Sequence, residues 1–297
     1  IAPLPLYHIY AFTVSLVMSD MGHEMVLIPN PRDIPGFVKE LSKHKFSSFA
    51  GLNTLFVALC NNKEFNALDF SHLKHTISGG MALTEAAAST WQKVTGCQIQ
   101  EAYGLTETSP AVSFNPYRDI RIGTIGKVVT GTQVKVISED GTDLGFDQEG
   151  ELCVKGPQVM AGYWQRPEAT AQVMDADGWF KTGDVAILAE DGFIRLVDRI
   201  KDMINVSGFN VYPNEIDDIA SQHSGILECA AVGIPNPVSG ETVKLFVVKS
   251  DPNLTADDVI SHCREHLTAY KVPKEVEFRD DLPKTNVGKI LRRALRD

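Results

Sequence analysis

Short apolar runs alternate with helix-patterned segments through residues 1–118, and this alternation limits the folds open to the chain. The strand-like runs are Met25–Ile28, Ser48–Leu52, His75–Ser78 and Ile99–Ala102. The helical patterns are Phe37–Leu41 after Pro35, Leu55–Leu59, and a segment capped by Thr84 that ends near Val94. Strands separated by helices form βαβ units, so this region is predicted to be α/β with a mostly parallel sheet.

The pattern changes in residues 119–198, where glycines recur between short strand-like runs. Two of these runs are Val134–Ile137 and Glu151–Val154. The pairs Asp140-Gly141 and Asp191-Gly192 are turn signals typical of β-hairpins. We therefore predict a small antiparallel β-sheet or barrel.

The charged segment Asp198–Asp202 separates two apolar patterns and is a candidate inter-domain linker, although composition alone favours a solvated turn. Beyond it, Pro213 is placed to begin a helix, and Thr255 with Asp258 forms a capping-box pattern for another. That second helix is expected to bury a stripe that reaches Tyr270. Strands are expected at Cys229–Ile234 and Val243–Val248. Residues 199–297 are thus predicted to be a compact α+β domain, separate from a domain of residues 1–198.

Composition excludes several classes of function. The formal net charge is -10, which disfavours non-specific binding to nucleic-acid phosphates. The five cysteines include no C-x-x-C pair, so free core thiols in a reducing cytoplasm are favoured over disulfides or a zinc site. No secretory signal is evident. The apolar run Ile9–Met18 is shorter than the roughly 20 residues of a membrane span, and we expect it to be buried near a sheet.

Two predicted strands end in glycine-bearing loops, Ser78–Gly80 and Ala102–Gly104. Ligands bind beyond the carboxyl ends of strands in open α/β sheets, and glycine lets a ligand approach the backbone. For either loop alone, a tight turn is the simpler interpretation. The second loop continues to Thr108, so that an adenine can stack on Tyr103 and Thr106 can donate to a phosphate. Glu107 is a candidate ligand for Mg²⁺, which prefers oxygen atoms.

The segment Tyr103–Thr108 resembles the nucleotide motif of the adenylate-forming superfamily, which includes acyl-CoA synthetases. Four further segments resemble motifs of that family, in the family's order: Pro5–His8, Asp177–Asp184, Asp198–Asn210 and Pro283–Lys289. The resemblance spans essentially the whole chain. It implies an acyl-CoA synthetase-like fold in which residues 1–198 belong to the large domain (1–118 α/β, 119–198 β-rich). Residues 199–297 would then be its small mobile domain.

The resemblance also implies roles for individual residues. Lys289, Thr106 and Glu107 are the implied catalytic residues, with Glu107 holding Mg²⁺. The implied nucleotide-binding residues are Gly79, Gly80, Tyr103, Gly104, Thr106, Asp184 and Arg199. Lys201 is the implied hinge, and the implied acyl and coenzyme A path comprises His8, Tyr10, Ser207 and Gly208. The alternatives are a turn aspartate for Asp184, a solvated cation for Lys289 and plain core packing for His8, Tyr10, Gly79 and Gly80.

The implied reaction activates a carboxylic acid with ATP and then transfers the acyl group from the adenylate to coenzyme A. Val206–Glu215 most resembles bacterial long-chain fatty-acyl-CoA ligases, which makes fatty acid, ATP and coenzyme A the expected substrates. Ligases for aryl or medium-chain acids remain alternatives, as does a non-catalytic nucleotide- or acyl-binding fragment. The expected localisation is cytoplasmic, and an insoluble substrate is compatible with peripheral association at the inner face of the membrane. Oligomeric state is not predicted.

The chain departs from the family's pattern in one feature, and two of its segments imitate motifs of other protein families. The family's phosphate loop is absent and would precede Ile1, so we interpret the chain as a truncated form that does not adenylate alone. Gly123–Lys127 does not replace that loop, because Arg121 occupies the first glycine position of the Walker spacing. His262–His266 fits the H-x-x-E-H pattern of some zinc peptidases, but a surface helix explains it more simply.

Overall fold

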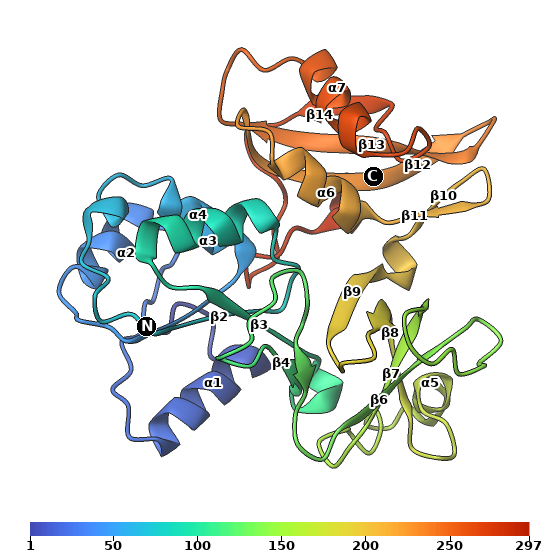
Figure 1. Ribbon diagram of the computed structural model, residues 1–297, viewed down its shortest axis with the longest axis horizontal. Helices are drawn as coiled ribbons and strands as arrows, with labels where there is room; N and C mark the ends of the chain where they lie inside the picture. The colour runs from blue at the N-terminus through green and yellow to red at the C-terminus, as the bar shows by residue number, and fades with distance from the viewer. Residues whose placement is uncertain (297) are drawn as a thin grey trace. The chain divides into compact units, whose positions relative to one another are not determined.

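The computed structural model describes residues 1–296, which divide into two compact units (Figure 1). Unit 1 consists of residues 1–83 and 87–196, and unit 2 consists of residues 84–86 and the chain from Val197 onward. We describe each unit by itself. Within residues 1–296, no helix combines the length and the apolar character that crossing a bilayer requires.

Unit 1 contains a five-stranded sheet with the strand order β1-β2-β3-β4-β5. Its strands are β1 (Ser48–Gly51), β2 (His75–Gly79), β3 (Ile99–Gly104), β4 (Ala111–Phe114) and β5 (Lys127–Val128). The β1/β2 and β2/β3 pairs are parallel, but β3/β4 and β4/β5 are antiparallel. The predicted parallel pairing is confirmed for β1, β2 and β3, and β4 and β5 extend the sheet through antiparallel pairs because the chain turns back on itself after β3.

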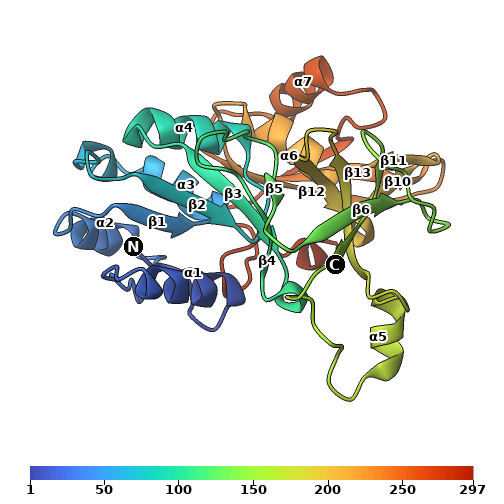
Figure 2. The same cartoon turned by 60° about the horizontal axis from the view of Figure 1, so that its bottom comes forward.

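Helices cover this sheet on both faces, with α1 opposite α4 (Figures 1 and 2). The helices are α1 (Ile9–Asp20), α2 (Ile34–Leu41), α3 (Asn53–Cys60) and α4 (Glu85–Thr95). Trp91 of α4 is fully buried at the centre of the core, with its ring centroid 4.8 Å from Phe56 and 5.2 Å from Phe49. Its indole donates to Thr76 Oγ1 over 3.1 Å, which ties α4 to β2.

Two expectations for the first 30 residues are wrong. Met25–Ile28 is not a strand, since Leu27 makes only an isolated bridge to Ala2. The apolar run at Ile9 is a helix that is buried only in part, because Leu16 and Val17 are 54% and 50% exposed. Apolar content alone does not say which side of a helix is covered.

The β-rich part of unit 1 is an open sheet with the order β6-β7-β8-β9, so the barrel alternative is wrong. The strands are β6 (Gln133–Ile137), β7 (Glu149–Lys155), β8 (Phe180–Leu188) and β9 (Ile194–Arg199). The Asp191-Gly192 pair turns the chain between β8 and β9, as expected. Helix α5 (Pro167–Val173) follows β7, and all of its residues are at least partly exposed.

Unit 2 is built on a sheet with the order β11-β10-β13-β12, and β14 pairs with β13. Its strands are β10 (Ile204–Val206), β11 (Phe209–Val211), β12 (Ile226–Asn236), β13 (Gly240–Lys249) and β14 (Glu275–Phe278). Helices α6 (Pro213–Ser221) and α7 (Ala256–His266) pack against each other. The predicted capping box of α7 is confirmed, but the helix ends at His266, and Tyr270 lies beyond it. Short 3₁₀ turns form in both units: η1 (Phe65–Ala67), η2 (Thr106–Thr108), η3 (Ile200–Asp202) and η4 (Arg292–Leu295).

Candidate active site

The loop after β3 is shaped by one glycine and one buried threonine. A side chain on Gly104 would overlap the carbonyl group of Pro110, so this position accepts only glycine. The hydroxyl of Thr108 is buried and accepts from the Leu105 amide over 3.0 Å, which fixes the η2 turn. The turn leaves Thr106 exposed and Glu107 half-exposed. The loop is thus a rigid support that presents a hydroxyl and a carboxylate to solvent.

Asp184 lies on β8 and is 5% exposed. The Tyr103 hydroxyl donates to its Oδ2 over 2.5 Å, a contact between residues that are 81 positions apart in the sequence. The Asp184 amide donates to Thr182 Oγ1 over 3.1 Å, and Thr182 in turn donates to the Leu152 carbonyl over 2.8 Å. The fold therefore brings together two residues that the sequence analysis assigned to the nucleotide. It also fixes the direction of the Asp184 carboxylate.

Glu107 has a partner that the sequence analysis missed. The Tyr163 hydroxyl donates to Glu107 Oε1 over 2.9 Å, and the Met160 amide donates to the Glu107 carbonyl over 2.8 Å. Thr170 accepts from the Tyr163 amide over 2.9 Å and so anchors Tyr163 to α5. Burial and the neighbouring carboxylate raise the pKa of Tyr163, which keeps its hydroxyl a donor at neutral pH. No spacing pattern near Tyr163 indicated this role.

The oxygen atoms on this loop fit a magnesium ion. Tyr163 occupies only one of the two carboxylate oxygens of Glu107. Thr106 adds a hydroxyl one residue away. Mg²⁺ is bound in many nucleotide sites by one or two protein oxygens together with phosphates and water. A single carboxylate with a hydroxyl beside it is a sufficient protein contribution to such a site.

The residues predicted for the acyl path in unit 1 make hydrogen bonds and packing contacts within that unit. Tyr10 is buried, and its hydroxyl donates to the Ile77 carbonyl over 3.0 Å. Its ring packs on Gly79, where an added side-chain carbon would lie 3.3 Å from the ring. His8 caps α1 by accepting from the Tyr10 amide over 3.3 Å. These contacts are consistent with core packing, and a role along the acyl path stays a prediction. Gly80 has a φ of 85°, which suits a glycine turn after β2.

The remaining predicted residues are in unit 2 or at its edge. Arg199 is the exposed last residue of β9, and Lys201 is exposed in η3. Ser207 and Gly208 form the tight turn between β10 and β11, with φ values of 54° and 86°. Lys289 lies in a turn in which the Thr285 amide donates to the Lys289 carbonyl over 2.7 Å. These side chains therefore occupy turns and element ends, where function commonly resides.

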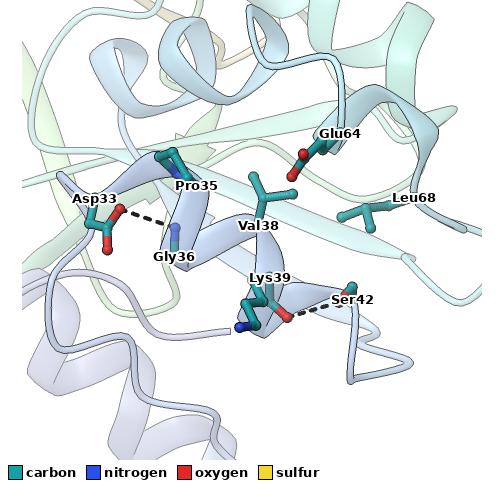
Figure 3. Close-up of a pocket in the computed structure, with 8 residues that line it drawn as sticks. All are labelled: Asp33, Pro35, Gly36, Val38, Lys39, Ser42, Glu64 and Leu68. Atoms are coloured by element: carbon teal, nitrogen blue, oxygen red, sulfur yellow. Dashed lines mark hydrogen bonds between the residues drawn. The ribbon is translucent and has the colours of Figure 1, made fainter.

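A surface pocket of about 560 Å³ lies beside α2 in unit 1 (Figure 3). Its lining consists of Asp33, Pro35, Gly36, Val38, Lys39, Ser42, Glu64 and Leu68. Asp33 caps α2 by accepting from the Gly36 amide over 3.1 Å, and Ser42 donates to the Lys39 carbonyl over 2.8 Å. Within the described part of the chain, the lining includes none of the predicted site residues.

The segments that imitate a phosphate loop and a zinc-peptidase motif, Gly123–Lys127 and His262–His266, have structural explanations. A side chain on Gly126 would overlap the backbone of Phe114, so the glycine of this segment allows a close approach between strands. The Nε2 atom of His262 lies 2.9 Å from the Ile219 carbonyl. Residues 1–296 contain no group of three or more His, Cys, Asp and Glu side chains placed to hold a metal ion.

Comparison with known proteins places the fold in a family. Residues 1–164 match the AMP-binding enzyme family, and residues 215–289 match the AMP-binding enzyme C-terminal domain. The chain belongs to the AMP-binding enzyme family. The predicted resemblance and the acyl-CoA synthetase-like fold are thereby confirmed. The solved structure of ATP-bound MatB from Rhodopseudomonas palustris is similar to this chain, with 32% identity and a TM-score of 0.89. The match covers 99% of this chain and 59% of that one.

Two curated relatives differ in their sequence identity to this chain. The long-chain-fatty-acid–CoA ligase of Salmonella typhimurium is 58% identical over 100% of the chain. The feruloyl-CoA synthase of an Amycolatopsis species is 34% identical over 98% of the chain. The chain spans 53% of the first relative and 60% of the second, so it corresponds to a little over half of their length.

Proposed function

We propose that the protein containing this chain is an acid–thiol ligase that activates a long-chain fatty acid with ATP and transfers it to coenzyme A. The observation that carries the proposal is the 58% identity to a long-chain-fatty-acid–CoA ligase along the whole chain. Identity to a feruloyl-CoA synthase, whose name indicates an aryl acid, is 34%. This difference favours a fatty acid over an aryl acid as the substrate.

In the first step the fatty-acid carboxylate attacks the α-phosphorus of ATP. The new carboxylate–phosphorus bond replaces the bond to pyrophosphate, which leaves. Asp184 accepts from the ribose hydroxyls, and its hydrogen bond from Tyr103 keeps the carboxylate in place for them. The ammonium group of Lys289 neutralises the negative charge that the carboxylate and the α-phosphate bring together. Arg199 is a second cation for the ribose or a phosphate.

Magnesium has a limited part in this proposal. When bound, the ion neutralises charge on the phosphates and orients them for displacement. Glu107 contributes a carboxylate to it, and Thr106 donates to a phosphate oxygen. Tyr163 orients Glu107 through the 2.9 Å hydrogen bond described above.

In the second step the thiol of coenzyme A attacks the carbonyl carbon of the acyl-adenylate. The thiol proton is lost, a thioester forms and AMP leaves. The Ser207-Gly208 turn contributes backbone to the coenzyme A path, with Lys201 at the hinge between the two steps. The turn is exposed, and the hydrogen bonds that the Ser207 and Gly208 amides donate to the Ser239 carbonyl and to Asn205 Oδ1 hold its backbone in place for this task.

The test uses the full-length gene product that carries this sequence. It is incubated with ATP, Mg²⁺, coenzyme A and saturated fatty acids from short to long, together with ferulic acid. Pyrophosphate, AMP and thioester are quantified separately. Thioester formation that peaks with long chains, and that Lys289→Ala lowers by about 100-fold or more, is the expected result.

Other outcomes select the alternatives. A peak with ferulic or medium-chain acids would replace the proposed substrate while keeping the reaction. ATP binding without pyrophosphate release for every acid would favour a non-catalytic nucleotide- or acyl-binding protein. The 297-residue chain assayed in parallel tests the expectation that it does not adenylate alone.

Peripheral association with a membrane is part of the same proposal, because long-chain fatty acids partition into bilayers. Flotation of the full-length protein with liposomes of neutral and anionic lipid measures this directly. Protein that stays in the dense fraction with both lipids would contradict it.

A further inference from the structure

Arg292 lies at the centre of a largely buried polar cluster in unit 2. Its side chain and that of Asp217 are each 14% exposed. The Arg292 Nη2 atom lies 2.7 Å from Asp217 Oδ2 and 2.7 Å from Asn214 Oδ1. Both partners are on α6, so one guanidinium nitrogen joins the C-terminal tail to that helix. Neither the proposed reaction nor the sequence analysis assigns a role to these residues.

The cluster continues to the end of β9. The Asn214 amide donates to Asp198 Oδ2 over 2.7 Å, and the Arg199 amide donates to Asp198 Oδ1 over 2.7 Å. Asp198 is 6% exposed. On the other side, the Ala231 amide donates to Asp217 Oδ1 over 2.7 Å. A continuous chain of polar contacts therefore links the tail through α6 to the segment that precedes Lys201.

Arg292 follows Lys289 by three positions, and the intervening backbone is short and constrained. The Leu291 amide donates to the Pro283 carbonyl over 2.7 Å, which closes the turn that carries Lys289. Leu295 is buried in a core cluster that also contains Leu282. The tail is thus fixed on both sides of Lys289. The polar contacts of Arg292 join this turn to α6 three positions after that lysine.

Stability alone is a weak explanation for this arrangement. A largely buried ion pair contributes little net stability compared with apolar side chains of similar volume. Here two carboxylates, Asp198 and Asp217, share the cluster with the one guanidinium. The Arg292 Nε atom is buried and has no hydrogen-bond partner in the described structure, which adds a desolvation cost. The directional contacts of the guanidinium fix a geometry that apolar packing would not specify.

We propose that Arg292 is a positioning residue that orients the Lys289 turn relative to the Asp198 end of β9. The proposal rests on the function proposed above, in which Lys289 serves the first step. It assigns Arg292 an effect on adenylate formation and little effect on the transfer to coenzyme A. Asn214 and Asp217 are the groups through which Arg292 acts.

The test compares Arg292→Gln, Arg292→Lys and the matched control Arg293→Gln in the full-length protein. Arg293 is the exposed neighbour, so its substitution removes the same charge from the surface of the tail. Exchange of labelled pyrophosphate into ATP with a long-chain fatty acid measures the first step. Thioester formation from supplied acyl-adenylate and coenzyme A measures the second step. Hydrogen exchange of residues 283–291 reports the order of the tail without any activity.

We expect Arg292→Gln to lower pyrophosphate exchange by about 100-fold, the scale that small misplacements of catalytic groups cause. The second step should change by less than about threefold, because Lys289 serves only the first step. Hydrogen exchange should accelerate in residues 283–291 while β12 and β13 stay protected. Arg292→Lys should recover part of the first step, since an ammonium can reach one of the two acceptors, and Arg293→Gln should match the wild type.

Equal losses in both steps, or general loss of protection across β12 and β13, would show a merely structural role and overturn the proposal. Unchanged pyrophosphate exchange and an unchanged tail would also overturn it. If the wild type activates no acid, the proposed function fails by itself. The hydrogen-exchange comparison then still decides whether Arg292 orders the tail.

Discussion

The protonation of Asp217 provides a quantitative test of how unit 2 is stabilised. Burial raises the pKa of Asp217 from 3.8 to about 7, although the Arg292 guanidinium and the Ala231 amide act in the opposite direction. The folded state therefore holds this proton over a pH range in which the unfolded chain has already released it. The perturbation is Asp217→Asn, which removes the titrating group and keeps a side chain of similar shape.

The sign and size follow from the two pKa values. Above pH 3.8 the unfolded chain ionises at Asp217, so stability falls with rising pH until the folded state also ionises near pH 7. A pKa difference of roughly 3 corresponds to about 4 kcal/mol in total. About 2 kcal/mol of this lies between pH 5.5 and pH 8.5. The wild type should lose that much more stability across this interval than Asp217→Asn loses.

The assay must report unit 2 alone. The three tryptophans, Trp91, Trp164 and Trp179, all lie in unit 1, so their fluorescence does not follow unit 2. Hydrogen exchange of peptides from β12 and β13 reports its opening directly. Exchange rates at pH 5.5 and pH 8.5 are divided by the intrinsic rates at each pH and converted to opening free energies.

The comparison between the two proteins isolates Asp217, because both retain Asp198 and the buried cysteines. At pH 5.5 the folded Asp217 still holds its proton, so Asp217→Asn removes no charge there, whereas at pH 8.5 it removes the carboxylate that pairs with Arg292. Only the difference in pH dependence tests the protonation. If the opening free energies of the two proteins change equally between pH 5.5 and pH 8.5, the reasoning about Asp217 is refuted.

Three further predictions concern the candidate site. Tyr103→Phe removes the donor to Asp184, a hydrogen bond to a charged group, and should raise the KM for ATP by roughly tenfold in an ATP titration; an unchanged KM would contradict this. Tyr163→Phe leaves Glu107 without its orienting hydroxyl and should weaken Mn²⁺ binding by roughly tenfold, measured by electron paramagnetic resonance of the free ion; equal binding would remove Tyr163 from the site. Gly104→Ala should destabilise unit 1 by more than about 2 kcal/mol in thermal unfolding followed by tryptophan fluorescence, and a melting curve like that of the wild type would show that the loop can adjust.

Local features of the chain were readable from the sequence. The helical spacing around Phe37, the strand at His75–Ser78 and the capping box of Thr255 are patterns of neighbouring residues, and each formed the expected element. The segment Tyr103–Thr108 was informative for the same reason, since its chemistry lies within six consecutive residues. Five segments in the order of one family then indicated the fold of nearly the whole chain.

The sequence thus determined the element types over most of the chain and the family to which it belongs, because periodicity, capping and motif order are recorded in adjacent positions. Tertiary structure alone decided that β4 runs antiparallel to β3 and that β5 runs antiparallel to β4, since the direction of a strand depends on how the chain returns to the sheet. It also decided the partners of the site carboxylates. Tyr163 and Glu107 are 56 positions apart, and Arg292 and Asp217 are 75 apart. Such hydrogen bonds exist only because packed elements bring distant side chains within reach, and no local pattern encodes them.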